Sequence, residues 1–331
     1  MFLCYNQMID SEFAAVNKLL RILILSLFIS TFIYVLPAFA QTTILDGTLA
    51  REHMNANGSQ LVFTDDDTGY IYYCDGSNLF YQKTTNGGTS WASQVQISSA
   101  AIDGDCGTSV VWYDQWTPSD TGDLVHILVA DRTTDDDLIY IEFDTSDDSS
   151  ATAVNISDGA SMDAGNYEVW LNNIAFTKAT DGDLYAAVAD DTSDYVLTCT
   201  GTCTTAGNWA ETSGASPFEG DDDHIQLMPL ATGDIIMIQH DLSADVVESK
   251  VWNETSWSAF TTIENSVEDL STTIDEFGSP PLVATHNPDD HTIYLAYIDY
   301  NTGGDFGTGD DDDIKTAKYS GGSWSSTTNA S

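Results

Sequence analysis

The feature that most constrains this chain is an apolar segment that recurs five times and ends each time on an aspartate. The five segments read YIYYCD (70–75), HILVAD (126–131), YAAVAD (185–190), IMIQHD (236–241) and LAYID (295–299). Their closing aspartates are separated by 56, 59, 51 and 58 residues. A period of this length indicates a repeated structural unit, and the short apolar stretches bounded by turn residues indicate that the unit is made of β-strands.

Each period has room for four short strands. A turn and another apolar stretch precede every segment, and a polar turn such as TTNGGTSW (84–91) follows the next stretch. Related turns keep a tryptophan at the same phase, in TCTTAGNW (202–209), ETSW (254–257) and GGSW (321–324). Because Asn-Gly-Gly supplies the positive φ angles that a hairpin needs, we expect these turns to join antiparallel strands.

Four-stranded units at this spacing predict an all-β fold, a β-propeller of five recognisable four-stranded blades. A tandem array of β-sandwiches needs about 100 residues for each domain, which the period does not allow. The expected repeat units span about 60–98, 108–157, 173–212, 225–265 and 280–331. A sixth blade with an N-terminal contribution stays an alternative.

Residues 1–40 predict a secretory signal peptide. Lys18 and Arg21 precede an apolar run from Ile22 to Leu36, and PAFAQ (37–41) provides a small-residue cleavage site. A transmembrane anchor is the alternative, but the run is short and no cluster of positive charge follows it. We therefore expect a single β-propeller domain over 41–331 in a secreted protein, extracellular or periplasmic, with no membrane span after cleavage.

Four cysteines remain after the predicted leader. Their even number in an exported chain indicates disulfides, and no histidine cluster at zinc-ligand spacing accompanies them. Cys74 ends a predicted second strand and Cys106 lies in the following link on the same face, so we expect these two to form a bridge. Cys199 and Cys203 are expected to form a small local bridge.

The net charge limits the partners of this chain. It has 52 Asp and Glu residues against 9 Lys and Arg, a formal charge of −43. Nucleic acid is excluded as a partner because there is no basic patch, and polyanions are repelled. Acid-rich runs such as 65–67, 135–137, 221–223 and 310–313 do not match the EF-hand spacing. We therefore assign no cofactor and no metal ligands, and Ca²⁺ stays an unassigned alternative.

The first polar turn resembles the BNR, or Asp-box, repeat of the sialidase (neuraminidase) superfamily, S/T-x-D-x-G-x-T-W/F. Five residues occupy its positions, with Asn in place of Asp and Ser in place of Thr: Thr84, Asn86, Gly88, Ser90 and Trp91. The resemblance is good in the first unit and degenerate in the others. It implies that this turn joins the third and fourth strands of a blade, away from the binding face, and has a structural role.

The same resemblance argues against sialidase activity. That family clamps a sugar carboxylate with three arginines and uses a tyrosine nucleophile with a glutamate partner. After the leader this chain has only Arg51, which precedes the first repeated strand, and Arg132, which follows one in a turn. We therefore expect a non-catalytic member of the superfamily and assign no catalytic residue.

Propeller geometry places the closing aspartates of the five segments on the face that usually binds ligands. They are candidates for contacts to a cation or to sugar hydroxyls, against the alternative that each caps its own strand end in an Asx-turn: Asp75, Asp131, Asp190, Asp241 and Asp299. Tyr167 and Trp170, in a link between blades, are candidates for sugar stacking, and packing between blades is the alternative.

The sequence therefore predicts a secreted, sialidase-like β-propeller that binds carbohydrate or a cell-surface or matrix partner. Two alternatives stay open: a glycoside hydrolase, sialidase-like or using carboxylates of the binding face, and a structural surface protein. An enzyme would hold a carboxylate of raised pKa paired with another across a pocket. A binding protein would instead present a shallow aromatic groove.

Overall fold

The computed structural model has 22 short strands among the residues it describes, in the order that the repeat predicts. It describes residues 60–75, 78–97, 102, 106–131, 137–157, 174–188, 195–212, 224–241, 244, 246–265, 282–299 and 313–329, all within one compact unit, Ile44–Ser331. Predictions about the leader lie outside these residues. Among the described residues, no helix is long and apolar enough to cross a membrane.

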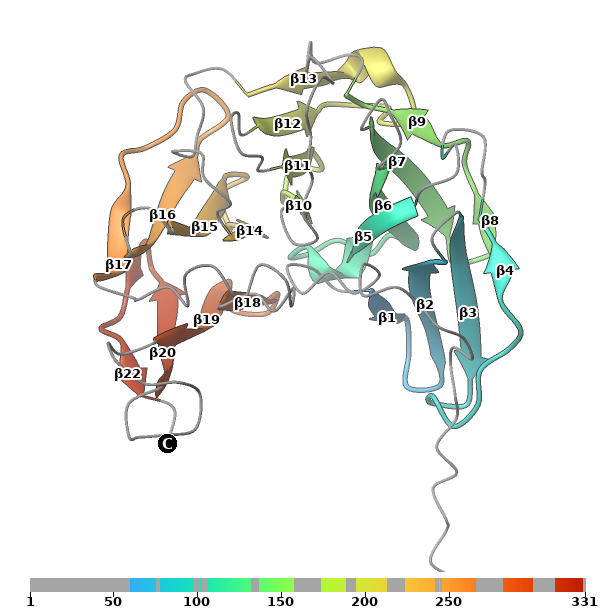
Figure 1. Ribbon diagram of the computed structural model, residues 1–331, viewed down its shortest axis with the longest axis horizontal. Helices are drawn as coiled ribbons and strands as arrows, with labels where there is room; N and C mark the ends of the chain where they lie inside the picture. Colours follow the sequence, from blue (N-terminus) through green and yellow to red (C-terminus); the bar gives the residue numbers. More distant parts are fainter. Residues whose placement is uncertain are drawn as a thin grey trace, which may run out of the picture. The chain divides into compact units, whose positions relative to one another are not determined.

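The strands form five antiparallel sheets, which we number first to fifth along the chain (Figure 1). The first sheet contains β1 (Leu61–Phe63), β2 (Thr68–Cys74), β3 (Leu79–Thr85) and β4 (Val95–Gln96). The second contains β5 (Cys106–Tyr113), β6 (Leu124–Asp131), β7 (Asp137–Asp144), β8 (Ser149–Ser150) and β9 (Val154–Asn155). The third contains β10 (Ile174–Lys178), β11 (Leu184–Val188), β12 (Tyr195–Cys199) and β13 (Trp209–Glu211). The fourth contains β14 (His224–Pro229), β15 (Ile235–Asp241), β16 (Val246–Trp252) and β17 (Thr261–Asn265). The fifth contains β18 (Leu282–Asn287), β19 (Thr292–Asp299), β20 (Asp313–Ser320), β21 (Ser323–Trp324) and β22 (Thr328–Asn329).

Consecutive sheets contact each other through their inner strands. The second sheet meets the first through β5 and β2, and the first strands of the second to fifth sheets, β5, β10, β14 and β18, adjoin in that order. The prediction of an all-β propeller with five recognisable four-stranded blades is confirmed. In the described part of the chain, the helical turns are the short 3₁₀ segments η2 (Asp114–Trp116) and η4 (Ala206–Asn208).

The fourth strand of the first sheet is shorter than its sequence pattern suggests. Trp91, Val95 and Ile97 alternate with polar or small residues and predict a strand over 91–97, but only β4 pairs with β3. Val95 is 46% exposed, whereas Ile97 is buried. The outermost strand has no neighbour beyond it, so alternation along it does not correspond to burial.

The contact between the first and second sheets is aromatic. The ring centroids of Tyr81 and Phe143 lie 4.8 Å apart, and those of Tyr70 and Tyr72 each lie 5.5 Å from Phe143. Tyr70, Tyr72 and Phe143 are almost fully buried. Burial of one such side chain stabilises the folded state by about 2–3 kcal/mol, so this cluster holds the two sheets together.

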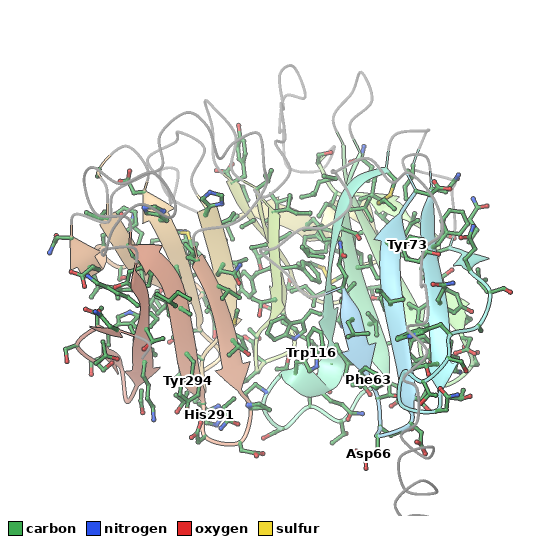
Figure 2. The ribbon with its side chains drawn as sticks, turned by 60° about the horizontal axis from the view of Figure 1, so that its bottom comes forward. Phe63, Asp66, Tyr73, Trp116, His291 and Tyr294 are labelled. Carbon is green, nitrogen blue, oxygen red and sulfur yellow. A yellow bond between two sulfur atoms is a disulfide. The ribbon has the colours of Figure 1, made fainter. Side chains whose placement is uncertain are left out.

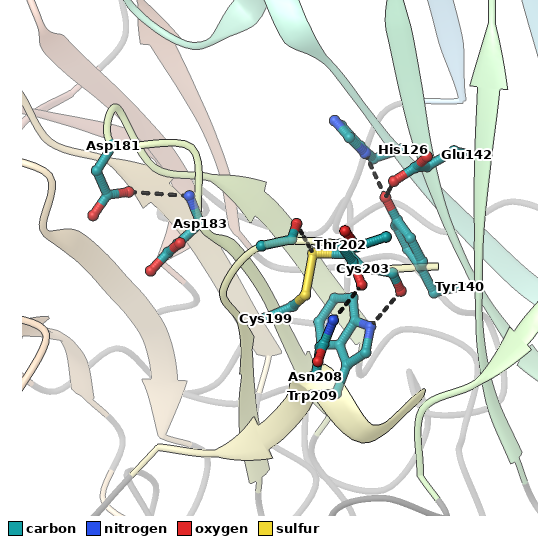
Figure 3. Close-up of a disulfide and its surroundings, with 11 residues drawn as sticks. His126, Tyr140, Glu142, Asp181, Asp183, Cys199, Thr202, Cys203, Asn208 and Trp209 are labelled. Carbon is teal, nitrogen blue, oxygen red and sulfur yellow. Dashed lines mark hydrogen bonds between the residues drawn. A yellow bond between two sulfur atoms is a disulfide. The ribbon is translucent and has the colours of Figure 1, made fainter. Parts of the chain in front are cut away.

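Both predicted disulfides are present. Cys74, at the end of β2, bonds to Cys106 with a Cα–Cα distance of 5.4 Å. Cys106 begins β5 and does not lie in the link before it, so this bond joins two neighbouring sheets directly. Its loop of 32 residues contributes about 3–4 kcal/mol in the chain-entropy account. The Cys199–Cys203 bond, with a Cα–Cα distance of 5.8 Å, stays within the third sheet beside Trp209 (Figure 3).

The sheets differ in how many faces are covered. Every residue of β11 and of β15 is buried, so the third and fourth sheets are covered on both faces. In β18 the residues from Leu282 to Thr285 alternate between buried and exposed, and β1 alternates in the same way. The fifth sheet therefore buries one face against the fourth and leaves the other open to solvent.

Candidate functional site

Two of the aspartates predicted for a binding face cap their own turns. Asp75 Oδ1 accepts a hydrogen bond of 2.9 Å from the backbone N–H of Asn78. Asp241 Oδ1 accepts one of 2.8 Å from the N–H of Ala244, and the Asp241 side chain is buried. Both contacts are Asx-type turns, which is the alternative that the sequence left open for these residues.

The other predicted residues are less completely described. Asp131 ends β6 opposite Asp137, and Asp299 ends β19 opposite Asp313, but their side chains are outside the described part. Asp190, Tyr167 and Trp170 lie outside the described residues altogether. A ring of carboxylates at this end of the sheets therefore stays a prediction.

The turn that resembles an Asp-box is built from its own side chains. Asn86 Oδ1 accepts hydrogen bonds from Thr84 Oγ1 and from the N–H of Ser90, both of 2.9 Å, and Thr84 Oγ1 accepts one of 3.0 Å from the N–H of Gly88. Gly88 has a φ of +80°, a backbone conformation that residues with a side chain rarely adopt. Trp91 packs edge-on against Phe63 of the same sheet, with 6.5 Å between ring centroids. All of these contacts are internal to the first sheet, as a structural role for the turn requires.

A buried ionic network joins the second and third sheets. Asp114 Oδ1 lies 2.9 Å from His126 Nε2 and 2.5 Å from Lys178 Nζ, and this lysine also pairs with Asp120 at 2.7 Å. Burial would raise the pKa of Asp114, but the hydrogen bonds and charges of His126 and Lys178 lower it to about 2. Since its partners are satisfied within the protein, we interpret this network as a structural link.

A different carboxylate, Asp183, has a raised pKa. It lies in the turn between β10 and β11 (Figure 3). Burial, with the negative charges of Asp181 and Glu254, raises the pKa of Asp183 to about 6. These three acidic groups come from turns of the third and fourth sheets. Among the described residues, no group of three or more acidic, histidine or cysteine side chains has an arrangement that could hold a metal ion.

Exposed apolar side chains are concentrated on the first and fifth sheets. Six large hydrophobic side chains of the described part are exposed, and five of them lie on β1 or on β18 to β20: Leu61, Phe63, Val283, Tyr294 and Ile314. Figure 2 shows Phe63 on the first sheet and Tyr294 on the fifth. In a chain of charge −43, these exposed apolar side chains make the surfaces of the two sheets the first places to look for an interaction site.

The open side of the fifth sheet carries a pocket of about 600 Å³. We call this side the free face. Strand register places its residues in two cross-strand rows, which are Thr285–Tyr294–Lys318 and Val283–Ala296–Thr316. Both rows line the pocket, and Ser325, Ser326 and Thr328 border it. This volume is within the range of small-molecule sites.

Tyr294 is the largest side chain of the pocket. It is 44% exposed, and Lys318 Nζ lies 5.5 Å from the centroid of its ring. Thr316 Oγ1 donates a hydrogen bond of 3.2 Å to the carbonyl oxygen of Thr328, which fixes the polar border. The free face thus combines an aromatic ring, hydroxyl groups and one ammonium group, which together can bind a ligand with both apolar and polar surface.

No motif in the sequence singles out Tyr294 or Lys318. Alternation in β18 to β20 gives both faces of the fifth sheet apolar residues, and the repeat leaves open whether each face has a neighbouring sheet. The only available signal was that the fifth unit is the last in the repeat, and this does not say which face lacks a neighbour.

No family model and no curated protein matches the sequence. The fold is nevertheless similar to solved structures. One is described as the Hadza microbial sialidase Hz136, with a TM-score of 0.50 and 13% identity over 84% of this chain. The match covers 58% of that sialidase. At this identity the similarity extends to the fold, so the chain has a sialidase-like β-propeller fold.

Two other solved structures are more distant. One is a polysaccharide lyase of family PL25, an ulvan lyase, with a TM-score of 0.48 and 10% identity, covering 84% of this chain and 72% of that one. The other is the intramolecular trans-sialidase from Ruminococcus gnavus, with a TM-score of 0.40 and 12% identity, covering 69% of this chain and 47% of that one.

Proposed function

We propose that the protein binds carbohydrate, and that the sugar lies on the free face of the fifth sheet against Tyr294. The observation that carries this proposal is the pocket of about 600 Å³ with an exposed tyrosine among hydroxyl and small apolar side chains. The C–H face of a pyranose packs on an aromatic ring, while its hydroxyls bond to polar groups at the border. A glycan on a cell surface or in a matrix is the natural source of such a ligand for a secreted protein.

The two disulfides support an extracellular setting, since such bonds persist in oxidising compartments. The predicted signal peptide agrees with this, and secretion is part of the proposal. We place the sugar on the free face and not at the predicted ring of aspartates, because Asp75 and Asp241 already accept hydrogen bonds from their own turns.

A glycan array, followed by calorimetric titration of the strongest binder, tests the proposal. Tyr294→Ala should weaken that binding about tenfold, because an aromatic contact contributes up to about 1.5 kcal/mol beyond area burial. Phe63→Ala is the matched control, since Phe63 is exposed to a similar extent on the first sheet and lies outside the pocket. Equal affinity of the wild type and Tyr294→Ala, or no glycan bound at all, would contradict the proposal.

Glycoside hydrolysis is a second candidate function, and Asp183 is the observation that favours it. A carboxyl group with a pKa of about 6 beside Asp181 and Glu254 meets the requirement for a general acid near a second carboxylate. Release of reducing ends from a polysaccharide panel, abolished in Asp183→Asn, would support an enzyme. Binding without any release of reducing ends would leave the carbohydrate-binding protein as the better description.

A further inference from the structure

We propose that the carbohydrate bound on the free face carries an anionic group, a carboxylate or a sulfate ester, and that Lys318 selects it. This inference rests on the proposed carbohydrate site and adds the class of ligand. It comes from the charges around the pocket and from the position of one lysine relative to Tyr294.

The pocket differs in charge from the rest of the protein. The whole chain has 52 acidic and 9 basic residues, yet no Asp or Glu is among the described residues that line the pocket. Lys318 is the one charged side chain of that lining. The pocket is therefore locally positive on a strongly negative protein, and an anionic group on the ligand complements it.

Lys318 also differs from three other lysines of the described part. Lys83, Lys178 and Lys315 each pair with a carboxylate at 3.5 Å or less. Lys318 forms no such ion pair in the part of the chain that the structure describes. Its side chain is exposed, and its ammonium group lies near the ring of Tyr294. Lys318 can therefore bind a ligand anion without breaking an ion pair to a described carboxylate.

Among the described residues, Asp290 has a carboxylate whose charge interacts with that of Lys318. Hydrogen bonds from Thr292 lower the pKa of Asp290, and the charge of Lys318 contributes to the same shift. Asp290 lies in the turn before β19 and does not line the pocket. It competes weakly for Lys318, so its removal should increase the affinity for an anionic ligand.

The charge of the whole protein does not prevent this binding at moderate salt. At about 0.15 M ionic strength the Debye length is about 8 Å, so a small ligand in the pocket interacts with Lys318 more strongly than with distant carboxylates. A long polyanion would meet the repulsion of many carboxylates at once. The preferred ligand is therefore a short saccharide, or the end of a chain, with one or a few anionic groups.

The test uses three trisaccharides that differ in one group. The first is β-1,4-linked glucotriose, the second has its non-reducing residue oxidised to glucuronate, and the third has a sulfate at O6 of that residue. Calorimetry or fluorescence anisotropy at about 0.15 M NaCl should show that one or both anionic forms bind up to about fivefold more tightly than the neutral form, the range of an exposed ion pair. The comparison of the two anionic forms distinguishes carboxylate from sulfate recognition.

Lys318→Gln should remove this preference, so that the ratio of the affinities for the anionic and neutral trisaccharides falls to about one. Lys315→Gln is the matched control, because it removes the same charge from the opposite face of the same strand. Asp290→Asn should increase the preference, and salt at about 0.5 M should reduce it in the wild type. Thermal melts of all variants show whether each one is folded.

The outcomes separate this inference from the function on which it rests. If the neutral and anionic trisaccharides bind the wild type equally, Lys318 does not select the ligand, and the carbohydrate site stands. If the preference persists in Lys318→Gln, the anion binds elsewhere and the inference is wrong. If none of the three binds the wild type, the carbohydrate proposal itself is overturned.

Discussion

The two faces of the fifth sheet come from the same strands but have different surroundings. On the inner face, Leu282, Leu295 and Tyr297 are almost completely buried against the fourth sheet. On the free face, Val283, Tyr294 and Ile314 are between 44% and 55% exposed. These residues alternate along β18 to β20, and both sets are apolar. The two faces therefore differ in whether a neighbouring sheet covers them, and not in residue type.

The charged groups of the two faces also differ, and Glu264 makes the contacts on the inner face. It belongs to β17 of the fourth sheet and accepts a hydrogen bond of 2.5 Å from Thr327 Oγ1. Lys315, on β20 of the fifth sheet, pairs with it at 3.5 Å. The inner face thus has its only described lysine paired with a carboxylate, whereas Lys318 on the free face has no such pair. The inner face stabilises the fold, and the free face is available to a ligand.

The largest effect should come from truncating the inner face. Tyr297→Ala removes a ring that is 2% exposed, and should lower the free energy of unfolding by about 3–5 kcal/mol. Tyr294→Ala removes the same side chain three residues away on the other face, and should lower it by less than about 1 kcal/mol. Urea denaturation of both variants measures the difference. Equal losses would mean that the free face is also part of the core.

Part of the pH dependence of stability should come from the inner face. Burial would raise the pKa of Glu264, but the hydrogen bond from Thr327 and the charge of Lys315 lower it below the usual 4.5. A lowered pKa in the folded state means that Glu264 stabilises the protein above about pH 4.5, and that this contribution is lost as the pH falls through the folded-state pKa. Urea denaturation at several pH values should therefore show a shallower acid-side loss in Glu264→Gln than in the wild type.

The smallest effect should come from an exposed apolar residue of the free face. Ile314→Ser replaces a side chain that is 55% exposed, and the free energy of unfolding should change by no more than about 0.5 kcal/mol. The same urea experiment measures it. A loss of 2 kcal/mol or more, in the range of core substitutions, would show that Ile314 is covered in solution.

Much of the fold could be predicted from local patterns. The five closing aspartates predicted the number of sheets, because their spacing follows the repeat of the second strands, β2, β6, β11, β15 and β19. The cysteines determined both disulfides, since one pair is only four residues apart and the other follows from two positions at the same end of neighbouring sheets. The turn at 84–91 could be predicted as a hairpin between third and fourth strands because Asn-Gly-Gly favours that geometry.

The candidate site could not be predicted in the same way. Asp75 and Asp241 were chosen for their recurring position, but a side chain at a strand end can bond to its own turn, and sequence does not distinguish that role from ligand binding. Tyr294 and Lys318 belong to no motif and lie 24 residues apart in the chain, and only strand register brings them together across β19 and β20. Such pairs depend on contacts between segments that are distant in the chain.

The sequence by itself determined the all-β class, the repeat of four strands and the bonding of the cysteines. These features depend on the repeat period, the turn residues and the cysteine spacing, which can be read within one repeat unit or between neighbouring units. Only the tertiary structure decided which apolar residues are core and which are surface. Burial requires a neighbouring sheet, and an apolar strand carries the same pattern whether or not a neighbour is present. Val283 and Leu282 are adjacent apolar residues of β18, and only their neighbours make one a candidate ligand contact and the other part of the core.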